Sequence, residues 1–181
     1  MLEQLIDAAI GRKKAEIVLK NGRFVNVFTG EICEGDIAIE GGKIVGFGKY
    51  EGETEYDIAG KIAVPGLIDA HVHIESSQLS PEEFARLVLP RGTTTVIADP
   101  HEITNVCGIA GAKYIADAAK NTPLEVKVML PSCVPATAFE TSGATLTGAD
   151  TEKYIGADFI HGLGEFMNYP GVIYKDTEVR K

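Results

Sequence analysis

Three polar side chains alternate along one short apolar segment, where they could bind a metal ion. Asp69, His71 and His73 are each separated by one residue. If the segment is a β-strand, all three project from the same face, with Cα atoms about 6.6 Å apart from one to the next. Two imidazoles at that spacing can converge on one divalent ion, at the usual Zn–N length of about 2.0–2.1 Å. His-x-His can also merely decorate a strand end, but two histidines that end an apolar strand beginning with Pro-Gly favour a ligand pair.

A second group of titratable side chains follows the next β-rich segment, residues 93–98. It consists of Asp99, His101 and Glu102, beside a proline that restricts the turn. These groups could supply a further metal ligand, a proton shuttle or a substrate contact. They could equally form a helix N-cap and turn, with Glu102 near a helix N-terminus. Both interpretations stay open.

Glu165 ends another apolar segment, residues 159–165. A carboxylate there could bridge two metal ions about 3.5–4 Å apart. A lone glutamate at a strand end is usually just solvated, so this hypothesis depends on the histidine pair. Glu75 and Ser76 follow that pair, and we expect them to contact substrate or to support the ligands. The serine has no G-x-S-x-G motif around it that would mark a nucleophile.

From residue 62 onward, apolar strand patterns alternate with helical patterns. We expect a buried strand over 63–73, further strands over 93–98, 125–130 and 159–165, and helices over 80–91, over about 105–120 and near 151–155. A serine N-cap, a proline and a glutamate three residues after the cap predict a capping box at Ser80. This alternation indicates right-handed βαβ units around a parallel sheet, an α/β fold.

The preceding residues predict a separate small domain. A short amphipathic helix is expected over 2–9, followed by two hairpins with turns at Asn21-Gly22 and Gly41-Gly42. Residues 15–62 therefore predict a small antiparallel sheet, which is too small to be stable without packing against something else. The expected domains are 1–62 and 63–181.

Composition excludes several classes of function. The 181 residues include 17 basic and 26 acidic side chains, a net charge of −9, which argues against nucleic-acid binding. No apolar run approaches the roughly 20 residues that cross a bilayer. The chain has three cysteines that lie far apart in sequence, so neither a disulfide framework nor a Cys-x-x-Cys metal site is indicated. We expect a cytoplasmic protein that is not attached to a membrane.

Residues 65–73, PGLIDAHVH, resemble the first-strand signature of the amidohydrolase superfamily. Residues 71–77, 98–108 and 164–171 are similar to the bacterial and archaeal adenine deaminase family, and the likeness extends over essentially the whole chain. The resemblance implies the N-terminal part of a TIM-like (β/α)₈ barrel, preceded by the small antiparallel β-sheet domain. A complete barrel takes about 250 residues, so the barrel is expected to be incomplete in this chain.

The resemblance also implies a site and a reaction. His71 and His73 would bind one metal, and Glu165 would bridge two, where many relatives use a modified lysine. The family uses two divalent ions, usually manganese or iron, with zinc also compatible. It hydrolyses a C–N bond of a cyclic amidine, converting adenine to hypoxanthine and ammonia in purine salvage. Asn168 becomes a further substrate-binding candidate, and Asp69 a residue supporting the ligands.

Family members continue through four more strands that supply further ligands. We therefore expect this chain to be an N-terminal portion with little activity alone, which forms a homo-oligomer or pairs with a complementary C-terminal segment. Two alternatives remain. One is another amidohydrolase that acts on cyclic amides, dihydroorotase-like or deacetylase-like. The other is a non-catalytic relic or assembly subunit.

Overall fold

The computed structural model describes residues 2–179 of the chain. Its internal contacts divide it into two compact units, residues 1–65 and residues 66–181, and each unit is described by itself. No helix in the described part is both long enough and apolar enough to cross a bilayer.

The first unit combines one helix with a small sheet. Its elements are α1 (Leu2–Ala9), β1 (Ala15–Val25), β2 (Ile32–Glu40), β3 (Lys43–Gly48), β4 (Gly52–Asp57) and β5 (Ile62–Ala63). The order is β3-β2-β1-β4, with β5 also paired to β1. The expected antiparallel sheet is present in β1, β2 and β3, whereas β4 and β5 join β1 in parallel.

The two expected turns of this unit have different outcomes. Gly41 and Gly42 both have positive φ, 54° and 71°, and they connect β2 to β3 as predicted. The predicted hairpin at Asn21-Gly22 is wrong, because β1 runs through it as one strand. Asn21 has a φ of 57°, and the register with β2 shifts between Leu19 and Gly22, so the positive φ forms a bulge.

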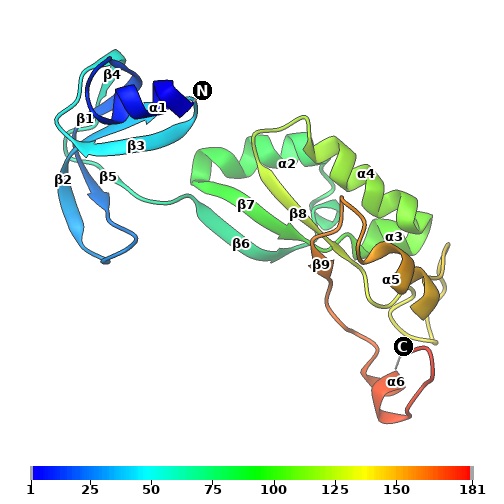
Figure 1. Ribbon diagram of the computed structural model, residues 1–181. Coiled ribbons are helices and arrows are strands. Elements are labelled where there is room, and N and C mark those ends of the chain that lie inside the picture. The colour runs from blue at the N-terminus through cyan, green and yellow to red at the C-terminus, as the bar shows by residue number, and fades with distance from the viewer. Residues whose placement is uncertain (1, 180–181) are drawn as a thin grey trace. The chain divides into compact units, whose positions relative to one another are not determined.

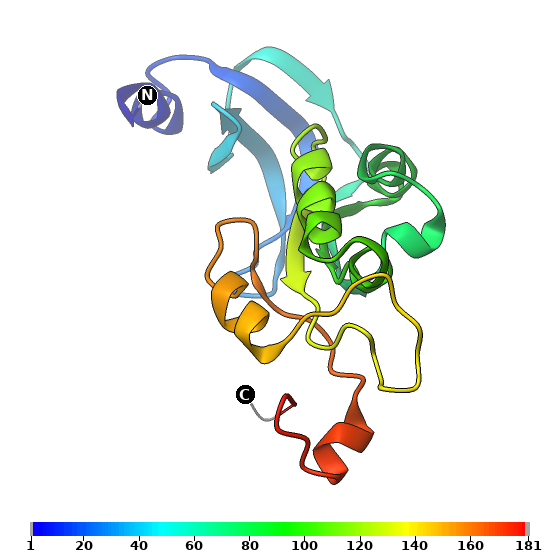
Figure 2. The ribbon, with the colours of Figure 1, turned by 90° about the vertical axis from the view of Figure 1, so that its right-hand side faces the viewer.

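The second unit is a layer of helices on a parallel sheet. Its strands, in the order β6-β7-β8-β9, are β6 (Leu67–Val72), β7 (Thr93–Ala98), β8 (Glu125–Leu130) and β9 (Gly162–Leu163). The helices are α2 (Pro81–Val88), α3 (His101–Cys107), α4 (Ile109–Ala119), α5 (Gly148–Tyr154) and α6 (Tyr169–Ile173), with 3₁₀ turns at Glu75–Ser77 and Leu89–Arg91. Figures 1 and 2 show α2 and α4 over one face of the sheet. The arrangement confirms the expected α/β fold with part of a parallel barrel.

Apolar side chains between these layers form the core of the second unit. Phe84 of α2 and Ile115 of α4 pack with Val96, Val128 and Leu130 of the sheet, all of them buried. Burying side chains of this size contributes about 1.5–3 kcal/mol each, which fixes the helices on the strands. The strand ends are therefore held on a rigid support.

The N-terminus of α2 follows the prediction in part. The Ser80 side chain accepts a hydrogen bond from the Glu83 backbone, and proline occupies the first helical position. The Glu83 carboxylate, however, pairs with Arg86 rather than returning to the cap. The reciprocal capping box forms instead at Thr147 and Asp150, where α5 begins.

Three sequence predictions for this unit need correction. The strand expected to be buried over 63–73 is largely exposed as β6, with Ile68 65% exposed, because it lies at the end of the strand order and pairs only with β7. The single helix expected over 105–120 is divided at Gly108 into α3 and α4. The strand expected over 159–165 is reduced to Gly162–Leu163.

Candidate metal centre

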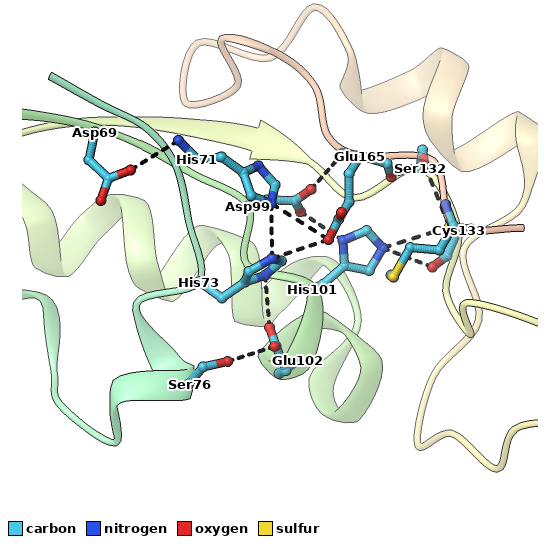
Figure 3. A network of polar contacts seen from close by, with 11 residues as sticks. Asp69, His71, His73, Ser76, Asp99, His101, Glu102, Ser132, Cys133 and Glu165 are labelled. Atoms are coloured by element: carbon cyan, nitrogen blue, oxygen red, sulfur yellow. Dashed lines mark hydrogen bonds and ion pairs between the residues drawn. The ribbon is translucent and has the colours of Figure 1, made fainter.

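The candidate ligands His71, His73 and Glu165 gather at the carboxyl edge of the parallel sheet, together with Asp99. His71 lies at the end of β6 and His73 just beyond it, while Asp99 follows β7 and Glu165 follows β9. Ser132, which the sequence analysis did not name, follows β8 at the same edge. Because all four strands run in parallel, their carboxyl ends share one edge, and the side chains meet there (Figure 3).

Two imidazoles and one carboxylate form a compact triangle of ligand atoms. Nε2 of His71 and Nε2 of His73 are 3.1 Å apart. Oε1 of Glu165 lies 3.1 Å from the His73 nitrogen and 3.6 Å from the His71 nitrogen. Ligand atoms about 2.0–2.1 Å from a tetrahedral metal ion are separated by about 3.3 Å from each other, so the three edges fit a divalent ion.

The chemistry of these donors also fits a metal. The atoms belong to one group of residues whose donors lie within 4.8 Å of one another. Their side chains are 48%, 22% and 39% exposed for His71, His73 and Glu165, so the triangle is open on one side. Imidazole nitrogens with a carboxylate oxygen suit manganese, iron or zinc, and the donor set does not select among them.

Glu102 and Ser76 lie behind the metal-facing side of His73. Oε2 of Glu102 is 3.1 Å from Nδ1 of His73, an ion-pair distance without full hydrogen-bond alignment. The Ser76 hydroxyl donates to the other oxygen of Glu102 over 2.6 Å. Partial burial raises the pKa of Glu102, but the Ser76 hydrogen bond, a backbone hydrogen bond and the charge interactions with His73 and His101 together outweigh it, so the net shift is downward. Glu102 is therefore a carboxylate that can hold the proton of His73 on Nδ1.

Asp99 and His101 form a buried pair beside the triangle. Nδ1 of His101 is 2.9 Å from Oδ1 of Asp99, and Nε2 is 3.0 Å from the Cys133 carbonyl oxygen. Burial lowers the pKa of His101, but its hydrogen bonds to Asp99 and Cys133 and the charge of Asp99 raise it to about 10. Both ring nitrogens can then donate, so the pair is an imidazolium with a carboxylate.

The backbone of Glu165 is bonded on both sides. Its N–H donates to Oδ2 of Asp99 over 2.7 Å, and its carbonyl accepts from the Ser132 hydroxyl over 2.5 Å. Asp99, His101 and Glu165 also lie close enough together to form a second candidate metal group. In that group both Asp99 oxygens and both His101 nitrogens already have hydrogen-bond partners.

A cleft of about 470 Å³ opens beside the triangle. Its size is within the range of small-molecule sites. The cleft is lined by both charged and apolar side chains: His73, His101, Glu102, Asn105, Val106, Ala136, Glu140, Glu165 and Met167. Two members of the triangle therefore face a space that could admit a small ligand.

The remaining sequence-predicted residues lie at the margins of this site. Oδ1 of Asp69 accepts from the His71 backbone N–H over 3.2 Å, so its contact is local. Glu75 accepts from the Ile103 backbone over 3.1 Å, and burial raises the pKa of its carboxyl. Asn168 caps α6 by accepting from Gly171, and it lines a different cavity from the cleft.

Two residues of the network were missed by the sequence analysis. Ser132 bonds the Glu165 carbonyl, and Cys133 bonds His101 through its own carbonyl. From the sequence, Cys133 was treated only as one of three widely separated cysteines. Both directly follow the strand predicted over 125–130, so their position at a carboxyl strand end was the available signal. Neither residue type is ordinarily charged at neutral pH, so residue type alone did not mark them.

Comparisons with known proteins bear on the second unit and on the chain as a whole. The model of the amidohydrolase family matches residues 62–181. An adenine deaminase of Clostridium acetobutylicum is 57% identical over 178 residues, which cover 98% of this chain and 31% of that protein. An adenine deaminase of Brucella anthropi is 55% identical over 179 residues, covering 98% and 32%. The chain thus spans about a third of the length of these relatives.

Solved structures show the same fold. The structure of atrazine chlorohydrolase from Arthrobacter aurescens TC1, complexed with zinc, matches with a TM-score of 0.59 and 16% identity, over 88% of this chain and 51% of that one. An L-hydantoinase from Arthrobacter aurescens matches with a TM-score of 0.55 and 22% identity, over 66% and 28%. At these identities the likeness concerns the fold alone.

Proposed function

Because the chain belongs to the amidohydrolase family, we propose that it is the metal-binding N-terminal portion of a hydrolase that converts adenine and water to hypoxanthine and ammonia. The observation that carries the proposal is the triangle of His71, His73 and Glu165, whose ligand atoms have the separations of a metal site. The substrate comes from the relatives, which are named adenine deaminase and are 57% and 55% identical over nearly all of this chain.

His71, His73 and the carboxylate of Glu165 would hold the divalent metal. A bound ion lowers the pKa of water, so that hydroxide is available near neutral pH. Carbon 6 of adenine is the electrophilic centre that hydroxide attacks in deamination. In this scheme the chain's own residues bind the ions, orient the imidazoles and offer the purine a cleft.

Glu102, Ser76, Asp99 and His101 would act around the ligands. The contact of Glu102 with Nδ1 of His73 supports a role in holding the imidazole with Nε2 toward the metal. The complete burial of Asp99 argues for a role away from the substrate. Glu75, Asp69 and Asn168 remain candidates for shaping the margins of the site.

The finer properties of the site are part of the same proposal. We assign two ions, manganese or iron, with zinc compatible with the donors. The three cysteines are free, as in proteins of reducing compartments, which supports a cytoplasmic location. The role in purine salvage rests on the adenine deaminases that the chain resembles. Leu67 and Ile68 of β6 are 60% and 65% exposed, which supports a second copy or a complementary C-terminal segment as a partner.

The test is release of ammonia from adenine with added Mn²⁺. The chain would be assayed alone and together with a polypeptide corresponding to the rest of the relatives' length. We expect little turnover alone and a clear gain with the added segment, and the gain should be lost in the His73→Ala variant. Dihydroorotate and hydantoin serve as competing substrates. Hydrolysis of a cyclic amide with adenine untouched would overturn the assignment of substrate.

A further inference from the structure

We propose that Asp99 and Ser132 form a latch that fixes the backbone of Glu165 and thereby aims its carboxylate at His71 and His73. The latch is defined by these two residues alone, and both act through Glu165 rather than on substrate. The inference rests on the metal site of the proposed function, since it says how one ligand of that site is held.

The two bonds of the latch fix both polar groups of one peptide residue. Oδ2 of Asp99 accepts from the Glu165 N–H over 2.7 Å, and the Ser132 hydroxyl donates to the Glu165 carbonyl over 2.5 Å. Asp99 follows β7 and Ser132 follows β8, so two neighbouring strands hold the residue. β9 itself is only the two residues Gly162–Leu163 long and cannot hold Glu165 through its own ladder.

Asp99 also connects this ligand to the histidines. Its backbone N–H donates to the Val72 carbonyl over 2.9 Å, and Val72 lies between His71 and His73 in the chain. One residue therefore bonds to both segments that carry the ligand atoms. The side chain of Asp99 bonds to the Glu165 segment, and its backbone N–H bonds to the segment that carries the two histidines. Because both bonds come from one residue, the two segments are held at a nearly fixed distance from each other.

The surroundings of Asp99 suit a fixed support rather than a substrate contact. Its side chain is completely buried. The oxygen that does not bond Glu165 is 2.9 Å from Nδ1 of His101, whose other nitrogen is 3.0 Å from the Cys133 carbonyl. A buried carboxylate is costly unless it is paired and hydrogen-bonded, and here both of its oxygens are.

Gly164 provides independent support. A Cβ at this position would lie 2.3 Å from Oδ2 of Asp99, closer than any real Cβ contact. The close approach of the Asp99 carboxylate to the Glu165 N–H therefore requires glycine at the preceding residue. A methyl group at position 164 would push the carboxylate away from that N–H.

Four variants test the latch in the full chain. D99A and S132A each remove one bond, and G164A displaces the carboxylate from the other side. D99N is the conservative variant, because its amide oxygen can accept from Glu165 while its NH₂ group donates to a neutral His101. The matched control is I115A, which opens a cavity in the apolar core of the same unit but removes no hydrogen bond of the site.

The first readout needs no metal. In the metal-free chain we expect the Glu165 backbone amide to be protected from hydrogen exchange, and we expect D99A to reduce that protection about tenfold or more. The second readout is the dissociation constant of Co²⁺ by absorption titration. It should rise about 10- to 100-fold in D99A and G164A, as for other residues that support metal ligands. D99N should restore most of the affinity.

The latch is refuted if the Glu165 amide exchanges freely in the parent chain, or if I115A weakens Co²⁺ binding per folded molecule as much as D99A does. If D99A does not fold, S132A and D99N decide: S132A must weaken Co²⁺ binding, because it frees the Glu165 carbonyl, and D99N must keep the Glu165 amide protected. A wrong substrate assignment gives a different result. Adenine would then not be hydrolysed, while the exchange of the Glu165 amide and the Co²⁺ affinities of the variants would still change as the latch predicts.

Discussion

His73 lies between two carboxylates, one on each ring nitrogen. Nε2 is 3.1 Å from Glu165, and Nδ1 is 3.1 Å from Glu102. A carboxylate on the far nitrogen fixes the tautomer and the orientation of a metal-binding imidazole and raises its basicity. Nδ1 of His73 is buried but has no well-aligned hydrogen bond. We expect its contact with Glu102 to tighten into a hydrogen bond when Nε2 binds a cation.

Substitution of Glu102 tests this arrangement. We expect Glu102→Gln to raise the Co²⁺ dissociation constant about tenfold, because the amide holds the Nδ1 proton less strongly than the carboxylate does. Ser76→Ala should have a smaller effect in the same direction. Glu83→Gln, at an exposed position on α2, is the matched control. Unchanged affinity in Glu102→Gln would show that Glu102 does not act through His73.

His101 predicts a pH dependence of stability. Its folded-state pKa, about 10, lies above the ordinary value of 6.5, so its contribution is complete below pH 6.5 and is lost as pH rises toward 10. Asp99 and the Cys133 thiol and carbonyl face this ring.

We expect the parent chain to lose on the order of 3 kcal/mol of unfolding free energy between pH 6.5 and 10 relative to His101→Gln. Denaturant unfolding across this range measures it, with His161→Gln as control; parallel curves for parent and His101→Gln would contradict the prediction.

The sequence was sufficient to identify the candidate metal ligands, but not the residues that hold those ligands in place. The period of two along β6 was enough to place His71 and His73 together, because side chains alternate on a strand. Convergence of Glu165 on them required the strand order, which local pattern does not contain. The different roles of Asp99, His101 and Glu102 depend on how deeply each side chain is buried. Burial is set by packing between elements that are distant in sequence, so the local sequence does not reveal it.

Of the two turns predicted in the first unit, the one at Gly41-Gly42 forms and the one at Asn21-Gly22 does not. Gly41 and Gly42 reverse the chain because both adopt positive φ. Asn21 also adopts positive φ, but its backbone N–H donates to Asp36 on β2, and the strand continues through a bulge. A positive φ is a local preference, whereas the choice between a turn and a bulge depends on the neighbouring strand.

The Lys20–Asp36 pair stabilises that bulge. The Lys20 ammonium is 2.5 Å from Asp36, whose side chain is 10% exposed. Burial raises the pKa of Asp36, but hydrogen bonds from Lys20, Tyr50 and Asn21 outweigh it, and the net shift is downward. This stabilisation is therefore present above the ordinary value of 3.8 and is lost as pH falls through the lower folded-state pKa.

We expect Asp36→Asn to cost about 1–3 kcal/mol near pH 7, because it leaves Lys20 partly buried without its counter-charge. The difference from the parent chain should shrink below about pH 4, where Asp36 is protonated in the unfolded chain. Amide exchange of β1 and β2 measures it in the full chain. Glu53→Gln, on exposed β4, is the control, and a difference that persists at pH 2 would contradict the ion-pair explanation.

At the scale of the whole molecule, the chain consists of two compact units and spans about a third of the length of its relatives, 31% and 32% for the two compared above. Strand and helix alternation, read from the sequence, was sufficient to predict the parallel sheet of the second unit. The exposure of β6 was not predictable from its apolar sequence, because that sequence suits a strand with neighbours on both sides.

Every role assigned to the residues around the site requires that His71, His73 and Glu165 bind a divalent metal ion. The direct measurement is titration of the purified full chain with Co²⁺, followed by its visible absorption, in the parent and in His71→Ala, His73→Ala and Glu165→Gln. We expect saturable binding by the parent chain and an affinity at least about 100-fold lower in each variant, with the affinity of His161→Ala unchanged. Equal binding by the parent and the three variants would contradict it.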